Sequence, residues 1–504
     1  MEISLKKIRE DVWEVPQSFK DYMLVPARVY AAESLLNKMR RDLTLQQTIA
    51  VASLPGVEKY SLVMPDGHQG YGFPIGGVAA TDFEDGVISP GGVGYDINCG
   101  IRLIRTNLRE EDLRPHLSRI LDGLFECIPS GLGLTGKVKL SFDQLDEVLR
   151  GGSEWCIENG YGWAEDVERT EDRGRLKAAN SDKIDAKSKQ RGAPQLGTLG
   201  SGNHFLEVQV VDEIFDERIA KAYGIDEIGQ VAVLIHTGGR GLSHGVCTYY
   251  LRKFEREMRK DSALSRILSL ERELACDYLR NSAGMDYFEA MCACANYAFA
   301  NRQIATYWVR KVFEDVLVQE AEDMGIRLVY DVAHNIAKEE EHVIAGKKKK
   351  LCVHRKGATR AFPAGDERLP AIYRSVGQPV LIPGSMGTRS FLTVGTETAK
   401  DETFGSCAHG SGREMSRTAA MKKYRGSEVK EALTKKNILV KVKDRTKRDV
   451  RRKRGKGIQS DKYSELAEEV AAAYKDPEVI VRSCEVAGIA KKIAAFRAIG
   501  LIKG

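Results

Sequence analysis

Five side chains that could bind a transition metal stand beside glycine-rich segments or directly after short apolar runs. Asp96 and Cys99 lie three residues apart in Gly91-Gly-Val-Gly-Tyr-Asp-Ile-Asn-Cys-Gly100. The other three are His204, His236 and His334. A carboxylate, a thiolate and three imidazoles together suit Mn, Fe, Co or Zn, whereas Mg²⁺ and Ca²⁺ prefer oxygen ligands alone.

Five ligands are more than one catalytic metal needs, since such a metal usually has three protein ligands and one open position. Two metals that share the Cys99 thiolate would use all five, at the spacing of about 3.5–4 Å typical of dinuclear phosphoryl chemistry. Each histidine taken alone could instead be a buried side chain with an ordinary hydrogen bond. The neighbouring glycines argue against that alternative, because a structural histidine does not require them, and the pattern predicts a metal site.

A second group of residues surrounds His409, in Ser406-Cys-Ala-His-Gly-Ser-Gly-Arg413. Gly410 and Gly412 allow backbone N–H groups to approach an anion, and Arg413 offers two parallel donors to a phosphate. A histidine ring nitrogen can also attack a phosphoryl or nucleotidyl group and form a covalent intermediate. The residues alone leave two interpretations open, a nucleophile or a histidine that only hydrogen-bonds a phosphate, and they favour the second.

A third small-residue turn, Pro383-Gly-Ser-Met-Gly-Thr-Arg-Ser390, follows an apolar run and could hold a nucleotide. It lacks the G-x-x-x-x-G-K-[ST] pattern of a P-loop. No glycine fingerprint of a dinucleotide-binding fold occurs with the strand, helix and acidic residue that such a fold requires. A nucleotide held here would therefore need a different arrangement.

Short apolar runs and longer helical periodicities must position these residues. Buried strands are predicted at residues 205–211, 231–235, 326–330 and 379–382. Helices are predicted at 262–281, at 285–324 as one bent helix or two, and from about Pro477. Because strands and helices do not alternate in a βαβ rhythm, we expect an α+β fold with mixed or antiparallel sheets flanked by helices. Without a linker signal, residues 1–504 are expected to form one large catalytic domain.

The composition is that of an ordinary globular protein, with 42% hydrophobic and 29% charged residues among 504. This excludes wholesale disorder. Neither a membrane-spanning run of about 18 apolar residues nor a secretory signal occurs, so we expect a cytoplasmic protein with no membrane contact.

The net charge is only +6, but ten basic residues fall within residues 441–456. A local concentration of this kind suggests a polyanionic partner such as nucleic acid, because each neutralised phosphate releases a counterion. A solvated basic insertion without contacts is the alternative. The lysine run at 347–350 is expected to be a solvated loop.

Six segments of the chain resemble the signature segments of the RtcB family of RNA ligases, in the family's order. They extend over nearly the whole chain, and together they are highly specific. They are Pro65-Asp-Gly-His-Gln-Gly-Tyr-Gly-Phe-Pro-Ile-Gly-Gly77, Ser89-Pro-Gly-Gly-Val-Gly-Tyr-Asp-Ile-Asn-Cys-Gly100, Leu199-Gly-Ser-Gly-Asn-His-Phe-Leu-Glu207, Asp331-Val-Ala-His-Asn335, Ile382-Pro-Gly-Ser-Met-Gly387 and His409-Gly-Ser-Gly-Arg413.

This resemblance implies an RtcB-like fold and an RNA ligase that joins an RNA 3′-phosphate, or a 2′,3′-cyclic phosphate opened to it, to a 5′-hydroxyl. GTP and two Mn²⁺ ions are the implied cofactors. In this scheme His409 becomes guanylylated and passes GMP to the RNA 3′-phosphate, and the 5′-hydroxyl then attacks and releases GMP. The implied partners are RNAs with such ends, for example tRNA halves, and an archease-type activating protein.

The resemblance also implies roles for individual positions. One metal is expected at Asp96, Cys99 and His204, and the other at Cys99, His236 and His334. Asp66 is expected to help open the cyclic phosphate or activate the 5′-hydroxyl. Contacts to the guanine nucleotide are expected from Asn203, Glu207, Asn335, Ser385, Ser390, Gly410, Tyr474 and Lys503. RNA phosphate contacts are expected from Arg191, Arg240, Arg413 and Arg417.

Several alternatives stay open at this point. A dinuclear metal phosphoesterase could hydrolyse RNA ends without nucleotidyl transfer, and a non-catalytic RNA-binding subunit could use residues 441–456 as its main feature. The arginines could form surface ion pairs, and Lys503 could lie in a solvated tail. One position departs from the family pattern, since Gly239 stands where a serine is expected.

Overall fold

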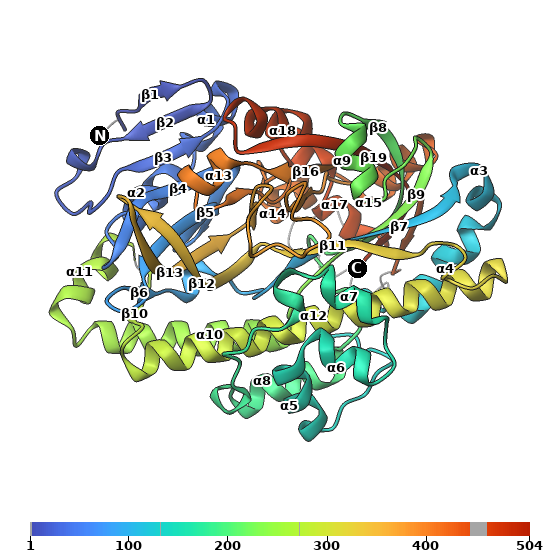
Figure 1. Ribbon diagram of the computed structural model, residues 1–504, viewed down its shortest axis with the longest axis horizontal. Helices are drawn as coiled ribbons and strands as arrows, with labels where there is room; N and C mark the ends of the chain where they lie inside the picture. The colour runs from blue at the N-terminus through green and yellow to red at the C-terminus, as the bar shows by residue number, and fades with distance from the viewer. Residues whose placement is uncertain (1–2, 132, 272, 444–460) are drawn as a thin grey trace.

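Two large β-sheets form the centre of the molecule in the computed structural model, which describes residues 3–131, 133–271, 273–443 and 461–504 (Figure 1). The first sheet has seven strands and is mixed, because β3 and β4 are parallel while the other neighbours are antiparallel. Its order is β1 (Lys6–Arg9), β2 (Val12–Val15), β3 (Ala27–Tyr30), β4 (Val57–Tyr71), β5 (Phe73–Asp82), β13 (Lys347–Lys356) and β12 (Asn335–Ile344).

The second sheet has eight strands and holds the residues of the predicted metal site. Its neighbours are antiparallel except that β18 (Leu439–Val442) pairs in parallel with β19. The order of the other strands is β11 (Arg327–Ala333), β7 (Gly100–Arg109), β9 (Gln230–Thr237), β8 (Phe205–Ile214), β19 (Ala490–Lys503), β16 (Ser390–Gly395) and β15 (Pro379–Ile382). Two small antiparallel pairs join β6 (Val87–Ile88) to β10 (Asp277–Tyr278) and β14 (Ala358–Arg360) to β17 (Ser406–Ala408).

A long helix, α12 (Ser282–Leu317), supports both sheets, since it contacts β9 of the second and β12 of the first. α10 (Arg240–Met258) packs against it and against α8 (Ala186–Gly192). Figure 1 shows α10 and α12 along the lower edge of the sheets, with α8 beneath them and α9 (Glu217–Ala222) on the opposite side. Further helices on α12 are α4 (Leu117–Cys127), α5 (Phe142–Gly151) and α6 (Ser153–Glu158).

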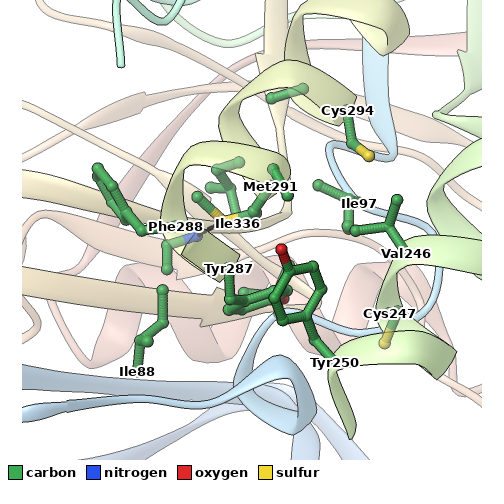
Figure 2. Close-up of a cluster of buried hydrophobic side chains, with 14 of the residues drawn as sticks. Ile88, Ile97, Val246, Cys247, Tyr250, Tyr287, Phe288, Met291, Cys294 and Ile336 are labelled. Carbon is green, nitrogen blue, oxygen red and sulfur yellow. Dashed lines mark hydrogen bonds between the residues drawn. The ribbon is translucent and has the colours of Figure 1, made fainter. Parts of the chain in front are cut away.

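The largest hydrophobic core lies between α10, α12 and the loop that precedes β7 (Figure 2). Tyr250 of α10 and Tyr287 of α12 meet there with ring centroids 5.2 Å apart. Ile97, from the predicted metal-binding segment, is fully buried in the same core. Burial of such a side chain contributes about 1.5–3 kcal/mol, so the core anchors the loop that carries Asp96 and Cys99.

The α+β prediction is confirmed. The strands predicted at 205–211, 231–235, 326–330 and 379–382 correspond to β8, β9, β11 and β15. The helix predicted at 285–324 is one helix, α12, and it ends where Val318 adopts a left-handed conformation with φ 56°. The C-terminal helix is α18 (Pro477–Val486), with proline in its first turn as predicted.

The helix prediction at 262–281 is wrong beyond its first half. Helix α11 (Ser262–Leu270) ends early, and the chain then runs to β10, which pairs with β6. Leu274 and Leu279 are buried in the core on this path. Burial and strand pairing therefore outweigh the local helix propensity.

The prediction of a solvated loop at 347–350 is also wrong, because β13 begins at Lys347. Ala345 and Gly346 both have positive φ and form the tight turn between β12 and β13. Two of the lysines have partners on neighbouring strands: Lys349 Nζ lies 2.6 Å from Glu58 and Lys350 Nζ 3.0 Å from Glu339.

Of the basic stretch at 441–456, residues 444–456 lie outside the described residues, and only 441–443 can be placed. Within the described part of the chain, no helix is both long enough and apolar enough to cross a membrane.

Candidate active site

The predicted metal ligands lie at one end of neighbouring strands of the second sheet. Cys99 precedes β7 and His204 precedes β8. His236 lies near the end of β9, and His334 follows β11. Since β7 lies between β11 and β9, and β9 pairs with β8, all four strand ends are adjacent.

The strand register sets this convergence. Gly100, the first residue of β7, pairs with Ala333 on one side and with Thr237 on the other. Phe205, the first residue of β8, pairs with His236. Residues that precede or follow these pairs must therefore meet at the same sheet edge.

The ligand atoms form two groups that share one sulfur. Cys99 Sγ lies 3.3 Å from His204 Nε2 and 3.2 Å from His236 Nε2. His204 Nε2 lies 2.7 Å from an Asp96 oxygen, and His236 Nε2 lies 3.3 Å from His334 Nε2. Within each group, Asp96–Cys99–His204 and Cys99–His236–His334, the ligand atoms lie within 4.8 Å of one another. These are the two groups that the family resemblance implies.

Burial sets the protonation of these groups. Burial, together with repulsion from neighbouring histidines, holds the pKa of His236 and of His334 well below the usual range, so both imidazoles are neutral. Burial, with the nearby Asp96, raises the pKa of the Cys99 thiol well above its usual value. Burial alone would raise the pKa of Asp96, but attraction to His204 outweighs it and lowers that pKa. Neutral imidazoles and an ionised carboxylate are the forms that bind metals.

The donor set fits a pair of transition-metal ions. The Nδ1 atoms of His204, His236 and His334 are buried and have no hydrogen-bond partner among the described residues. Their Nε2 atoms face only one another, the Cys99 sulfur and the Asp96 carboxylate. Such a buried arrangement is costly without a cation, and three imidazoles, a sulfur and a carboxylate suit a borderline metal.

A buried arginine holds the loop behind the metal ligands. Arg302 Nη1 donates to the carbonyls of Asn98 at 2.7 Å and Thr237 at 3.0 Å. Its other nitrogens pair with Asp331 at 2.8 Å. Asn98 adopts φ 55°, so these contacts fix an unfavourable backbone conformation directly before Cys99.

His409 lies beside this cluster and is bound by Asp66. The Asp66 carboxylate accepts from the backbone N–H of His409 at 3.0 Å and lies 2.6 Å from ring atom Nδ1. The ring of His409 lies 4.7 Å from that of His334, measured between centroids. Asp66 is fully buried while the His409 side chain is 14% exposed. The carboxylate therefore lies behind the ring and orients it, and it does not face the RNA as the expected role in hydroxyl activation would require.

A cavity of about 1360 Å³ opens over these residues. All of the predicted site residues line it except Asp66, His334 and Ser390. Ser390 lies behind the wall, where its hydroxyl accepts from the backbone N–H of Gly384 and from Gln209. The expectation that Ser390 contacts the nucleotide is therefore corrected to a supporting position.

Several of the predicted nucleotide contacts are already tied to the protein. Gln209 donates to Glu207 at 2.6 Å. Lys503 is buried and donates to the carbonyls of His204, at 2.9 Å, and Gly202. It is a residue of β19 and not part of a solvated tail. Asn203, Ser385 and Gly410 line the same cavity.

Asn335 has bonds at both ends of its amide. Its Nδ2 donates to the Asp96 carbonyl at 3.2 Å, and its Oδ1 accepts from Gly357 N–H at 2.9 Å. Asn335 therefore also fixes the metal-binding loop.

The predicted RNA-binding arginines do not form surface pairs. Arg413 Nη1 lies 2.9 Å from Glu469 and 2.8 Å from the Tyr474 hydroxyl. Arg417 Nε donates to the other oxygen of Glu469 at 3.0 Å. Glu469 is buried, and the sequence gave no sign that it organises these three side chains.

Arg240 is almost fully buried and braces the metal loop. Its backbone N–H donates to Asp96 at 3.2 Å, and its Nε donates to Thr198 at 3.1 Å. Arg191, by contrast, is exposed at the rim of the cavity.

Gly239, where a serine is expected, has no room for a side chain. A Cβ atom there would lie 1.7 Å from the hydroxyl oxygen of Ser243. Ser243 therefore fills the space that a serine at 239 would need.

Sequence reasoning missed Lys475, His68 and His244. Lys475 is buried and donates to the carbonyls of Pro65, at 3.3 Å, and Gly67, which flank Asp66. His68 and His244 line the cavity. The His68-containing segment was singled out as a whole, but nothing in the spacing of Lys475 indicates its contact with a segment about 400 residues away.

Comparison with known proteins agrees with this geometry. The sequence model of the family described as "tRNA-splicing ligase RtcB" matches residues 47–451. The tRNA-splicing ligase RtcB of Thermococcus kodakarensis is 52% identical over 502 residues, which is 100% of this chain and 99% of the relative. Those of Pyrobaculum aerophilum and Archaeoglobus fulgidus are each 50% identical, over 100% of this chain and 99% and 100% of their own lengths. The chain therefore belongs to the RtcB family of tRNA-splicing ligases.

Proposed function

We propose that this RNA ligase joins RNA 3′-phosphate or 2′,3′-cyclic phosphate ends to 5′-hydroxyl ends, with GTP and Mn²⁺ as cofactors and guanylylated His409 as an intermediate. The names of its relatives support RNA ends as substrates. One observation carries the nucleotidyl step: His409 is held by Asp66 at 2.6 Å and lies against His334 of the predicted metal site.

The five converging side chains are the proposed Mn²⁺ ligands. Asp96, Cys99 and His204 would hold one ion, and Cys99, His236 and His334 the other. When bound, such a pair neutralises phosphoryl oxygens and stabilises the charge that develops when phosphorus is attacked.

His409 is the proposed nucleophile because Asp66 selects its tautomer. With the Nδ1 proton donated to Asp66, Nε2 keeps its lone pair. Nε2 then attacks the α-phosphorus of GTP, a P–N bond forms, and the P–O bond to diphosphate breaks. The Asp66 carboxylate stabilises the positive charge that the ring acquires.

The RNA 3′-phosphate next attacks the same phosphorus, which breaks the P–N bond and returns the His409 ring. The 5′-hydroxyl oxygen then attacks the RNA 3′ phosphorus, loses its proton, and forms the phosphodiester as GMP leaves. A bare 3′-phosphate is a poor substrate, so transfer of GMP supplies the leaving group that the last step needs.

Glu207 is the proposed guanine contact. A carboxylate accepts from the N1–H and N2–H donors of guanine, and adenine lacks this pair. Gln209 and Ser390 hold this carboxylate from behind. Lys503, Asn203, Ser385, Gly410 and Tyr474 would surround the remaining parts of the nucleotide.

A labelling experiment tests the nucleotidyl step. Protein loaded with Mn²⁺ and incubated with α-phosphate-labelled GTP should acquire an acid-labile label, as a phosphoramidate would. His409→Asn should abolish it, and His116→Asn, outside the cavity, should not. A wild-type protein that cleaves RNA ends but never takes up label would instead be the phosphoesterase.

The biological setting follows from the same family. We propose that tRNA halves are substrates, that the protein is cytoplasmic, and that an archease-type protein activates it. Repeated rounds of ligation of tRNA halves, measured with and without such a protein, test the activating partner.

A further inference from the structure

A second groove adjoins the predicted active site, between α8 and α10. Its volume is about 590 Å³. Arg191 lines both this groove and the active-site cavity, so the two are continuous. We call it the α8–α10 groove.

The two helices meet at the floor of the groove without a gap. A Cβ atom added to Gly245 of α10 would lie 2.1 Å from the Ser188 hydroxyl of α8. Because the backbones approach so closely here, longer side chains on either side stand up as the walls.

These walls are predominantly basic. Lys187 and Arg191 lie one turn apart on α8, and Arg252 and Arg256 lie one turn apart on α10. All four are exposed, and no ion pair is recorded for any of them among the described residues. Arg256 Nε donates only to the Arg252 carbonyl, at 3.2 Å. Two acidic residues line the groove, Asp185 and Glu255, so its net charge is positive.

An exposed aromatic ring lies among these cations. Tyr249 lines the groove and is 44% exposed. A flat ring beside several unpaired cations is typical of sites that bind single-stranded nucleic acid, where bases stack and phosphates are neutralised.

The groove lies at the end of the active site that is remote from His409. From His409 the contacts run through His334 and His236 to Cys99. They continue through His204 and Asp96 to Arg240, the first residue of α10. In an in-line displacement the attacking and leaving oxygens lie on opposite sides of phosphorus. A strand that approaches from the α10 side therefore carries the attacking hydroxyl, since GMP leaves on the side of His409.

We propose that the α8–α10 groove binds the 5′-hydroxyl RNA strand several nucleotides downstream of its reacting end. This inference rests on the proposed ligase function. Lys187, Arg252 and Arg256 contact backbone phosphates, and Tyr249 stacks on a base.

The geometry predicts a dependence on strand length. From His244, at the active-site cavity, to Arg256 the helix rises about 18 Å, at about 1.5 Å per residue. A stacked strand covers this in about five nucleotides, at about 3.4 Å each. A dinucleotide with a 5′-hydroxyl cannot reach Arg256, whereas a decanucleotide can.

The test uses the double variant Arg252→Gln/Arg256→Gln with one fixed 3′-phosphate strand and 5′-hydroxyl strands of two and ten nucleotides. For the ten-nucleotide strand, KM should rise about tenfold, and the slope of log affinity against log salt should become shallower by about two. For the dinucleotide, KM should change less than twofold. The matched control is Arg218→Gln/Lys221→Gln on α9, which removes the same charge on the opposite side of the molecule (Figure 1).

Formation of the GMP adduct, measured without RNA, separates the two levels of the argument. If wild-type protein forms no adduct and seals no ends, the proposed function fails. If wild-type protein seals ends but the groove variant keeps the wild-type KM for the ten-nucleotide strand, the groove inference is wrong. It is equally wrong if the effect follows the length of the 3′-phosphate strand.

Discussion

Asp66 binds His409 twice, at the backbone N–H and at ring atom Nδ1. The two contacts fix both the rotamer and the tautomer of the imidazole, which leaves Nε2 toward the cavity. Lys475 in turn binds the carbonyls on both sides of Asp66. The reactivity of one side chain therefore depends on three segments that are distant in sequence.

We predict that Asp66→Ala slows guanylylation of His409 about 10²–10⁴-fold, because the ring loses the partner that selects its tautomer. KM for GTP should stay within about threefold, since Asp66 does not line the cavity. Single-turnover quench with labelled GTP measures both values. An unchanged rate constant would show that the carboxylate has no orienting role.

Glu207 should make GTP use pH-dependent. Burial, only partly offset by Gln209 and Lys503, raises the pKa of Glu207 to about 7. The ionised carboxylate is the form that accepts from guanine, so KM for GTP should fall as pH rises through 7 and level off above 8. Glu207→Gln should remove this dependence and raise KM at pH 8 about tenfold. KM values for adduct formation from pH 6 to 8.5 would contradict the assignment if they were flat or rose with pH.

Secondary structure elements bring the ligands together through their order in the sheet, which the sequence does not reveal. The strands around His236 and His334 could be predicted, because continuous apolar runs mark them. The neighbour order β11–β7–β9–β8 could not, since it depends on pairings across more than 200 residues. Residue types alone left each histidine open to a structural interpretation, and the family resemblance supplied the grouping.

Other elements were obscured by local signals. The lysines at the start of β13 conceal a strand, because their charged ends pair with glutamates on adjacent strands. Leu274 and Leu279 continue a helical periodicity but are buried by an extended path. The supporting roles of Lys475 and Glu469 could not be predicted, because a buried charge is identifiable only from its partners.

Arg302 should couple stability to metal binding. Arg302→Met removes the donors to Asn98 and Thr237 and one partner of Asp331. We expect the free energy of unfolding to fall by about 3–5 kcal/mol and Mn²⁺ affinity to fall at least tenfold. Urea unfolding and calorimetric titration measure the two effects.

Arg310→Met is the matched control. Arg310 is also buried, and it pairs with Asp166 at 2.6 Å away from the ligands. Its loss should cost similar stability but leave Mn²⁺ affinity unchanged. Equal losses of affinity in both variants would mean that Arg302 acts only through global stability.

At the scale of the whole molecule, the active site joins the two sheets. Asp66 lies on β4 of the first sheet, and the metal ligands lie at the strand ends of the second. His409 follows β17 and contacts both. Any substitution that shifts one sheet against the other should therefore affect nucleotidyl transfer before it affects metal binding.

The basic residues at 441–456 should add to RNA affinity without sequence preference. Replacing five of them with glutamine should make the slope of log affinity against log salt shallower by about three, at about 0.7 per phosphate on single strands. Fluorescence anisotropy with a labelled RNA at several salt concentrations measures it. An unchanged slope would show that this segment does not contact the RNA.

The most direct measurement is anomalous diffraction at the manganese edge from crystals soaked with Mn²⁺ and GTP. Two peaks should flank Cys99 Sγ, one near His204 and one near His334, and continuous density should join His409 Nε2 to phosphorus. A single peak that does not touch Cys99, or a nucleotide attached to another residue, would contradict the account.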